Sequence, residues 1–257
     1  MEIDVESEDW LAEELAGVIG ACGAEPFLKA DILVPETRHF PFVWQRDESG
    51  VRVLAERLMA HAGLGDYRAD VQLFLDDEAD GPPGVPSFDL RQERKHKGPA
   101  AFFLGTDGQT ARFGCEVHNL PNGESMVGLM GHEVAHLFRQ VKGVCREDRA
   151  LEEYLTDITT VYLGFGVFTA NASHRYSSRG AQEGVMSVTE WSHNRLGYLP
   201  ASSFCFLLAC QAAARAQAGE ADRIARHLEP NQRAYFLDAF RDISENRVLL
   251  MEMLGLG

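Results

Sequence analysis

The stretch GHEVAH, which contains His132, Glu133 and His136, constrains the fold of this chain more than any other. Residues four apart lie on one face of an α-helix, so both imidazoles would project from the same side within about 6 Å. That separation lets two ring nitrogens bind one Zn²⁺ at about 2.0–2.1 Å each. Glu133 lies one position around the helix and can stand beside a water without being a ligand. The spacing therefore predicts a helix with a zinc-binding face.

Apolar residues surround this motif at helical spacing and predict a helix over 124–141. They can hold the helix against a core: Met126, Val127, Leu129, Met130, Val134, Leu137 and Phe138. The alternative is that His132 and His136 are structural or exposed histidines that bind no metal.

Candidates for a third ligand lie on the next predicted helix. A catalytic zinc commonly takes three protein ligands and leaves one position for water. Glu153 and Asp157 are four apart and share a helix face. Enough chain separates them from His136 for the first helix to end, turn at Gly143 and return antiparallel. Glu152 is a competitor, although it faces about 100° away from Glu153 on a helix.

This combination resembles the gluzincin group of metallopeptidases, which have Glu-x-x-x-Asp on the helix after His-Glu-x-x-His. By that resemblance Glu153 is the third ligand. Asp157 would accept a hydrogen bond from the free ring nitrogen of a ligand histidine and fix its tautomer. The chain departs from the thermolysin pattern, because Glu152 stands where that pattern has Asn. Zincins that use aspartate offer an alternative, in which Asp157 itself is the ligand.

Three further segments look like a poorly characterised group of soluble bacterial His-Glu-x-x-His proteins: EYLTDITTVYLGFGVFTAN, ILVPETRHFP and RLGYLP. This resemblance is spread over most of the chain, but only the metal motif is mechanistically specific. It implies a zincin-like fold and a zinc-dependent hydrolase, foremost a metallopeptidase that acts on peptide or protein substrates. The alternative is a zinc-binding regulatory or partner-binding protein of the same fold without peptidase activity.

The expected chemistry assigns a role to each residue. Zinc would polarise the substrate carbonyl and acidify its bound water, and Glu133 would act as general base. A tetrahedral oxyanion needs a further donor besides zinc. The polar segment WSHNRLGYLP supplies Tyr198 and His193 as candidates. By analogy with zincins, the strand expected at 110–117 would form the upper rim of the cleft.

Composition narrows the classes of partner. The 257 residues include 24 Lys and Arg against 39 Asp and Glu, a net charge of −15 concentrated in the first 80 residues. Nucleic-acid binding is disfavoured, because it needs clustered basic residues. No apolar run reaches the roughly 18–20 residues that span a bilayer. Five cysteines without a Cys-x-x-Cys pair, and the acidic start MEIDVESEDW, predict a cytoplasmic protein.

The periodicity predicts an α+β protein, and the resemblance implies a single zincin-like domain over 1–257. A strand-containing acidic lobe is expected over 1–120, with a small, mostly antiparallel sheet packed on a helical metal-site lobe over 121–257. Ser7 should cap the first helix and Gly23 should end it. Strands are expected at 27–35, 71–75, 100–104 and 110–117. Further helices are expected at 50–64, 124–141, 149–170, 201–218, 221–227 and, with a break, 231–253.

Overall fold

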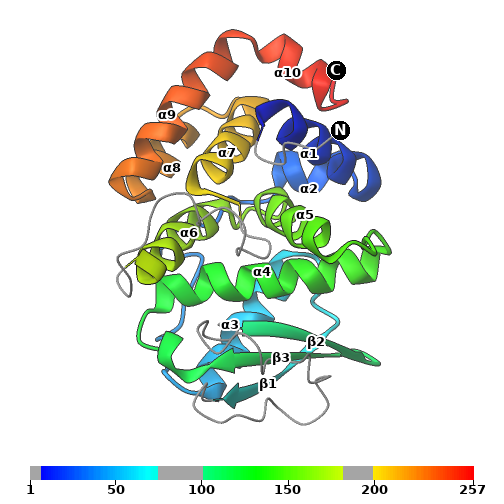
Figure 1. The fold of residues 1–257 in the computed structure, drawn as a ribbon, viewed down its shortest axis with the longest axis vertical. Coiled ribbons are helices and arrows are strands. Elements are labelled where there is room, and N and C mark those ends of the chain that lie inside the picture. Colours follow the sequence, from blue (N-terminus) through cyan, green and yellow to red (C-terminus); the bar gives the residue numbers. More distant parts are fainter. Residues whose placement is uncertain (1–6, 75–100, 182–198) are drawn as a thin grey trace.

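The fold is built around one long helix, α4 (Gly123–Lys142), with a small sheet on one side and a stack of helices on the other (Figure 1). The computed structural model describes residues 7–74, 101–181 and 199–257. The protein is α+β and predominantly helical. Its elements in chain order are α1 (Glu8–Cys22), α2 (Ala24–Lys29), α3 (Glu48–His61), β1 (Arg68–Phe74), β2 (Ala101–Asp107), β3 (Thr110–Glu116), a 3₁₀ turn η1 (Val117–Asn119), α4, α5 (Arg149–Tyr162), α6 (Gly166–Ala181), α7 (Ala201–Arg215), α8 (Glu220–His227), α9 (Pro230–Glu245) and α10 (Arg247–Met253).

Helix α4 has well-defined ends. The Asn122 side chain accepts a hydrogen bond from the Ser125 amide at 3.0 Å, which satisfies one of the N–H groups left open at a helix start. Gly143 ends the helix in the left-handed conformation with φ at +68°, where a side chain would be strained. Between these caps almost every residue from Met126 to Arg139 is buried. The predicted helix and its turn at Gly143 are therefore confirmed.

Within the described residues, the sheet has three strands in the order β1-β3-β2. The β1 and β3 strands are parallel, whereas β2 and β3 are antiparallel, so the sheet is mixed rather than mostly antiparallel. Because β3 is hydrogen-bonded on both sides, it has no free edge with which to pair an extended substrate, and the zincin analogy that placed 110–117 at the cleft rim needed such an edge. Strand β2 is the one that packs along α4. A shift of register between Phe103 and Gly105 interrupts the β2–β3 pairing and bends β2 locally.

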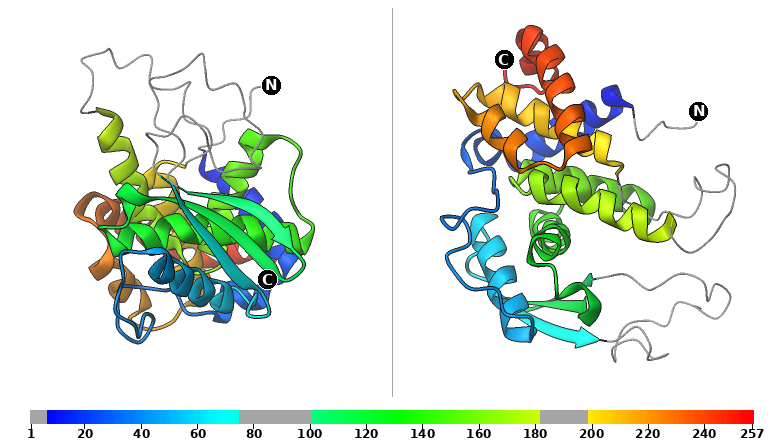
Figure 2. Two further views of the ribbon diagram at one scale, coloured as in Figure 1. Left: turned by 90° about the horizontal axis from the view of Figure 1, so that it is seen from below. Right: turned by 90° about the vertical axis from the view of Figure 1, so that its left-hand side faces the viewer.

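The first helices do not pack on the sheet. Ser7 caps α1 and Gly23 ends it, as predicted. In Figure 1, α1 and α2 lie beside α7 and α10, and the right-hand view of Figure 2 shows the sheet at the opposite end of the molecule. Of the described part of residues 1–120, only the segment from α3 to β3 therefore forms the lobe that contains the sheet.

The strand predicted at 27–35 is absent, and this prediction was wrong. Residues Ala24–Lys29 form the short helix α2, and Ile32, Leu33 and Val34 continue as a buried extended segment. The Leu33 amide donates to the Gly164 carbonyl at 2.8 Å. An apolar run can be buried between helices as well as within a sheet, and periodicity alone does not distinguish the two environments.

The single helix predicted over 149–170 is two helices, α5 and α6, that meet at Gly164. This glycine has a φ of +84°, and a Cβ there would lie 2.5 Å from the Asp31 carbonyl oxygen. The break therefore needs glycine both for the backbone conformation and for the close approach of the 31–34 segment. The break lets α6 leave the direction of α5 and pack against α4 and α7.

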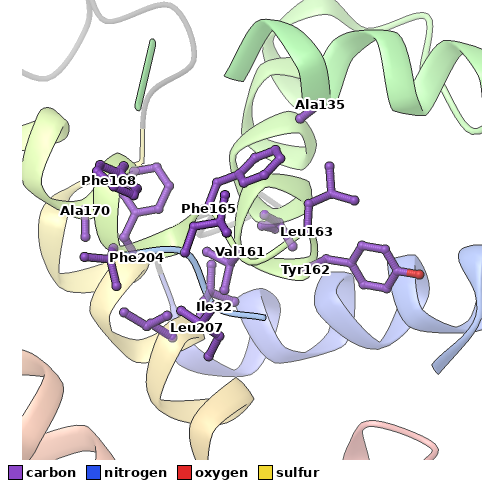
Figure 3. Close-up of a cluster of buried hydrophobic side chains, with 14 of the residues drawn as sticks. Ile32, Ala135, Val161, Tyr162, Leu163, Phe165, Phe168, Ala170, Phe204 and Leu207 are labelled. Atoms are coloured by element: carbon purple, nitrogen blue, oxygen red, sulfur yellow. The ribbon is translucent and has the colours of Figure 1, made fainter. Parts of the chain in front are cut away.

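The helical layer is held by a large apolar core. In Figure 3 five core side chains meet: Ile32 from the extended segment, Val161 from α5, Phe165 from the α5–α6 junction, and Phe204 and Leu207 from α7. Ala135 of α4 belongs to the same cluster. The break predicted in the last helix occurs at Asn246, between α9 and α10. Among the described residues, no helix is both long and apolar enough to cross a bilayer.

Candidate metal centre

Helices α4 and α5 run antiparallel and place the predicted site residues opposite one another. Contacts pair the two helices in reverse order: His132 meets Asp157, His136 meets Glu153, and Arg139 meets Glu152. The short turn after Gly143 brings the chain back, as the sequence predicted. The site therefore lies across a helical hairpin, and both helices are buried along the faces that meet.

Three side-chain atoms converge on one point. The Nε2 atom of His132 lies 3.1 Å from Glu153 Oε2, and the Nε2 atom of His136 lies 3.3 Å from the same oxygen. Ligand atoms of these three residues all lie within 4.8 Å of one another. Two imidazole nitrogens and one carboxylate oxygen are the donor set of many catalytic zinc sites. The residues present therefore fit a divalent transition metal.

The opposite nitrogen of each imidazole is hydrogen-bonded away from that point. His132 Nδ1 donates to Asp157 Oδ1 at 2.8 Å. The Thr156 hydroxyl donates to the Glu152 carbonyl at 2.8 Å, so its oxygen is free to accept from His136 Nδ1 at 3.2 Å. With Nδ1 carrying the proton in both rings, both Nε2 lone pairs face the point shared with Glu153. The surrounding residues thus hold both histidines in the tautomer that a metal ligand needs.

Asp157 is itself fixed. Its second carboxylate oxygen accepts the Leu199 amide at 2.7 Å, so both oxygens are engaged by the protein. The side chain is buried, and this burial raises its pKa despite the hydrogen bond from His132. Glu153, and not Asp157, thus reaches the converging nitrogens.

Glu133 lies next to the three-residue group without joining it. It is buried, and the backbone amide of Phe103 on β2 lies near enough to favour the charged form of its carboxylate. Burial raises the pKa of Glu133, opposed by the charges of His132 and His136. A carboxylate with a raised pKa beside a metal site is suited to accept and return a proton.

The pKa values of His132 and Glu153 are shifted in opposite directions by their surroundings. Burial lowers the pKa of His132, but the hydrogen bonds with Asp157 and Glu153 and the charges of Asp157 and Glu133 outweigh it and raise that pKa well above its ordinary value. Burial raises the pKa of Glu153, but the two histidines outweigh it and bring that pKa far below its usual range. The carboxylates at this site thus favour a positive charge between them, which a proton or a metal cation can supply.

The site is open on one side. The side chains of His136 and Glu153 are 19% and 20% exposed, whereas that of His132 is 4% exposed. The side chains of His136 and Glu153 are therefore partly in contact with solvent.

The competitor Glu152 points elsewhere. Its two carboxylate oxygens each lie 2.8 Å from the Arg139 guanidinium, and Oε2 also accepts the Arg146 amide at 2.8 Å. As the helical wheel predicted, neighbouring positions on α5 face different surroundings.

Sequence reasoning missed several contributors. Thr156 follows Glu153 by almost one helical turn, and this spacing could have suggested it as a neighbour of a ligand histidine. Phe103 and Leu199 contribute only their backbone amides, so their residue types do not mark them as part of the site. The other predicted residues, Tyr198 and His193, lie outside the described residues.

Comparison of the chain with models of known protein families, with curated proteins and with solved structures finds no match. The interpretation of the site therefore depends on its own geometry and chemistry.

Proposed function

We propose that this protein is a zinc-dependent hydrolase, and within that class a peptidase, in which His132, His136 and Glu153 hold the ion. The observation that carries the proposal is the convergence of three ligand atoms within 4.8 Å of one another. The hydrogen bonds of both Nδ1 atoms support it, because they leave the Nε2 lone pairs for the metal. The partial exposure of His136 and Glu153 supports access by a substrate.

The chain's own residues define the chemistry. When bound, zinc supplies a Lewis acid that polarises a carbonyl and acidifies water. Glu133 would accept the proton of the attacking water at its carboxylate and pass it to the leaving amine. The Phe103 amide favours the charged form of that carboxylate. Asp157 and Thr156 hold the two imidazoles in place.

The cellular setting that we propose is the cytoplasm. All five cysteines are free thiols: Cys22, Cys115, Cys145, Cys205 and Cys210. Free thiols fit a reducing compartment. The partners proposed are peptide or protein substrates.

Glu133→Gln tests this function. The variant should retain zinc, because Glu133 is not among the three converging residues, and it should lose cleavage of a peptide library. General acid–base groups typically contribute roughly 10²–10⁴-fold in rate. Glu124→Gln is the matched control, since Glu124 is an exposed glutamate in the first turn of the same helix. Metal content is measured by mass spectrometry and cleavage by product sequencing.

Two outcomes would contradict the proposal in different ways. Less than about a tenth of an equivalent of metal after zinc supplementation would reject the metal centre itself. Full zinc loading without cleavage of any peptide would reject the peptidase and favour a zinc-binding regulatory or partner-binding protein.

A further inference from the structure

Arg139 is a fully buried arginine one turn along α4 from the candidate ligand His136. Its side chain is 2% exposed. It donates through Nε and Nη2 to the two carboxylate oxygens of Glu152, each at 2.8 Å. It also donates to Thr159 Oγ1 at 3.2 Å and to the Val144 carbonyl at 3.1 Å. One guanidinium thus joins α4, the turn after it and two positions on α5 that lie about two helical turns apart. We call Arg139, Val144, Glu152 and Thr159 the arginine clamp.

Stability alone does not account for such a cluster. Burying an ion pair costs desolvation that its attraction often only repays, so apolar residues in its place are frequently as stable. A bidentate pair does provide directional geometry, because the two parallel N–H···O bonds fix the relative orientation of both groups. The arginine clamp is therefore suited to set how α5 is rotated and placed against α4.

The rotation of α5 decides which glutamate meets the histidines. Glu152 and Glu153 are adjacent, and their side chains project about 100° apart around the helix. In the structure Glu152 is held by Arg139, while Glu153 Oε2 lies between the two Nε2 atoms. Releasing Glu152 would free α5 to rotate and a second carboxylate to compete for the same place.

We infer that Arg139 is a positioning residue for the metal centre, which holds Glu152 so that Glu153 reaches His132 and His136. This inference depends on the metal centre proposed above but not on its peptidase activity. It assigns Arg139 no contact with the metal or with substrate.

The test measures cobalt and zinc affinity by chelator competition, and the Co²⁺ absorption spectrum, in full-length protein. Arg139→Gln should lower metal affinity about 10–100-fold, the usual loss when an outer partner of a ligand is removed. It should also change the Co²⁺ spectrum, which reports ligand identity and geometry. Arg139→Lys keeps the charge but loses the planar bidentate geometry, so its metal affinity should fall between those of wild type and Arg139→Gln.

Arg215→Gln is the matched control. The Arg215 side chain is likewise 2% exposed, forms an ion pair with buried Glu220 at 3.0 Å and donates a hydrogen bond to the Ala30 carbonyl. Neither Glu220 nor Ala30 belongs to α4 or α5. It should lower the thermal midpoint and leave metal affinity and the Co²⁺ spectrum unchanged. If Arg139→Gln fails to fold, Glu152→Gln provides a milder change, since it keeps the side-chain shape and removes the charge.

The double variant Arg139→Gln/Glu152→Gln separates positioning from stability. Removing both charges relieves the buried unpaired carboxylate, so stability should partly recover, whereas metal affinity should stay low. Folded variants at Arg139 and Glu152 with wild-type affinity and spectrum would overturn the inference, as would an equal loss in Arg215→Gln. Wild-type protein that binds metal and cleaves no peptide would overturn only the peptidase proposal. Wild-type protein that takes up no metal would overturn both.

Discussion

The candidate metal centre and the arginine clamp lie one helical turn apart on the same pair of helices, yet they are completed in different ways. In the clamp, the chain itself supplies the cation, and the Arg139 guanidinium faces the two oxygens of Glu152. In the metal centre, Glu153 Oε2 faces two Nε2 atoms whose Nδ1 protons are directed elsewhere. In the clamp, Arg139 supplies the donors that the Glu152 carboxylate accepts. In the metal centre, three residues instead place acceptor atoms around one shared point.

This difference suggests how a helical hairpin can hold a reactive site. Convergent acceptors at a partly buried site are stabilised by a positive charge between them, which either a proton or a metal ion supplies. The neighbouring arginine clamp, in which donors and acceptors are paired, can hold α4 and α5 in place whether or not a metal is bound. The following substitutions test this division of roles, from the largest expected effect to the smallest.

Glu153→Ala should cause the largest loss. It removes the carboxylate that lies between the two Nε2 atoms, so metal affinity should fall by more than about 100-fold, the upper end expected for an outer residue. Asp157→Ala should cost about 10–100-fold, because it acts through His132. Chelator competition measures both. The reverse order would make Asp157 the ligand and contradict the assignment made here.

Metal removal should lower stability through the metal centre. At a free zinc concentration of about 100 times the dissociation constant, binding adds about 2.7 kcal/mol to the free energy of unfolding. Urea titration with zinc and with chelator measures this increment. The increment should fall to about 0.4 kcal/mol or less in Glu153→Ala at the same zinc concentration. An undiminished increment in that variant would place the stabilising zinc elsewhere.

Thr156→Val should have an intermediate effect. Valine keeps the shape of this fully buried residue but removes the oxygen that accepts from His136 Nδ1. Metal affinity should fall about tenfold, at the lower end for such partners. Thr156→Ser retains the hydroxyl and is the control. Equal affinity in the valine and serine variants would show that another group sets the tautomer of His136.

Thr159→Val should have the smallest effect on the metal. It removes one of the acceptors of Arg139, at 3.2 Å, and leaves both bonds to Glu152. Unfolding free energy should fall by about 1 kcal/mol. Metal affinity should stay within about twofold of wild type, because the bidentate pair remains. A tenfold loss of affinity would mean that every contact of the clamp is needed for positioning.

Much of the local structure follows from short-range signals. Local sequence patterns predicted the caps at Ser7 and Gly143, helix α4 and the three strands, because each is indicated by residues close to it in the chain. The break at Gly164 was missed because its cause lies far away in sequence, at the Asp31 carbonyl. The parallel pairing of β1 with β3 was missed for the same reason, since it joins strands that are not consecutive.

The sequence by itself determined the chemistry available: two histidines on one helix face, a glutamate beside them and carboxylates on the following helix. Helical periodicity is a local property, so the chain encodes those faces directly. Only the tertiary structure decided which carboxylate meets the imidazoles, because the answer depends on the rotation of α5 against α4. That rotation results from contacts such as Arg139 with Glu152 and Asp157 with the Leu199 amide, between residues that no local pattern connects.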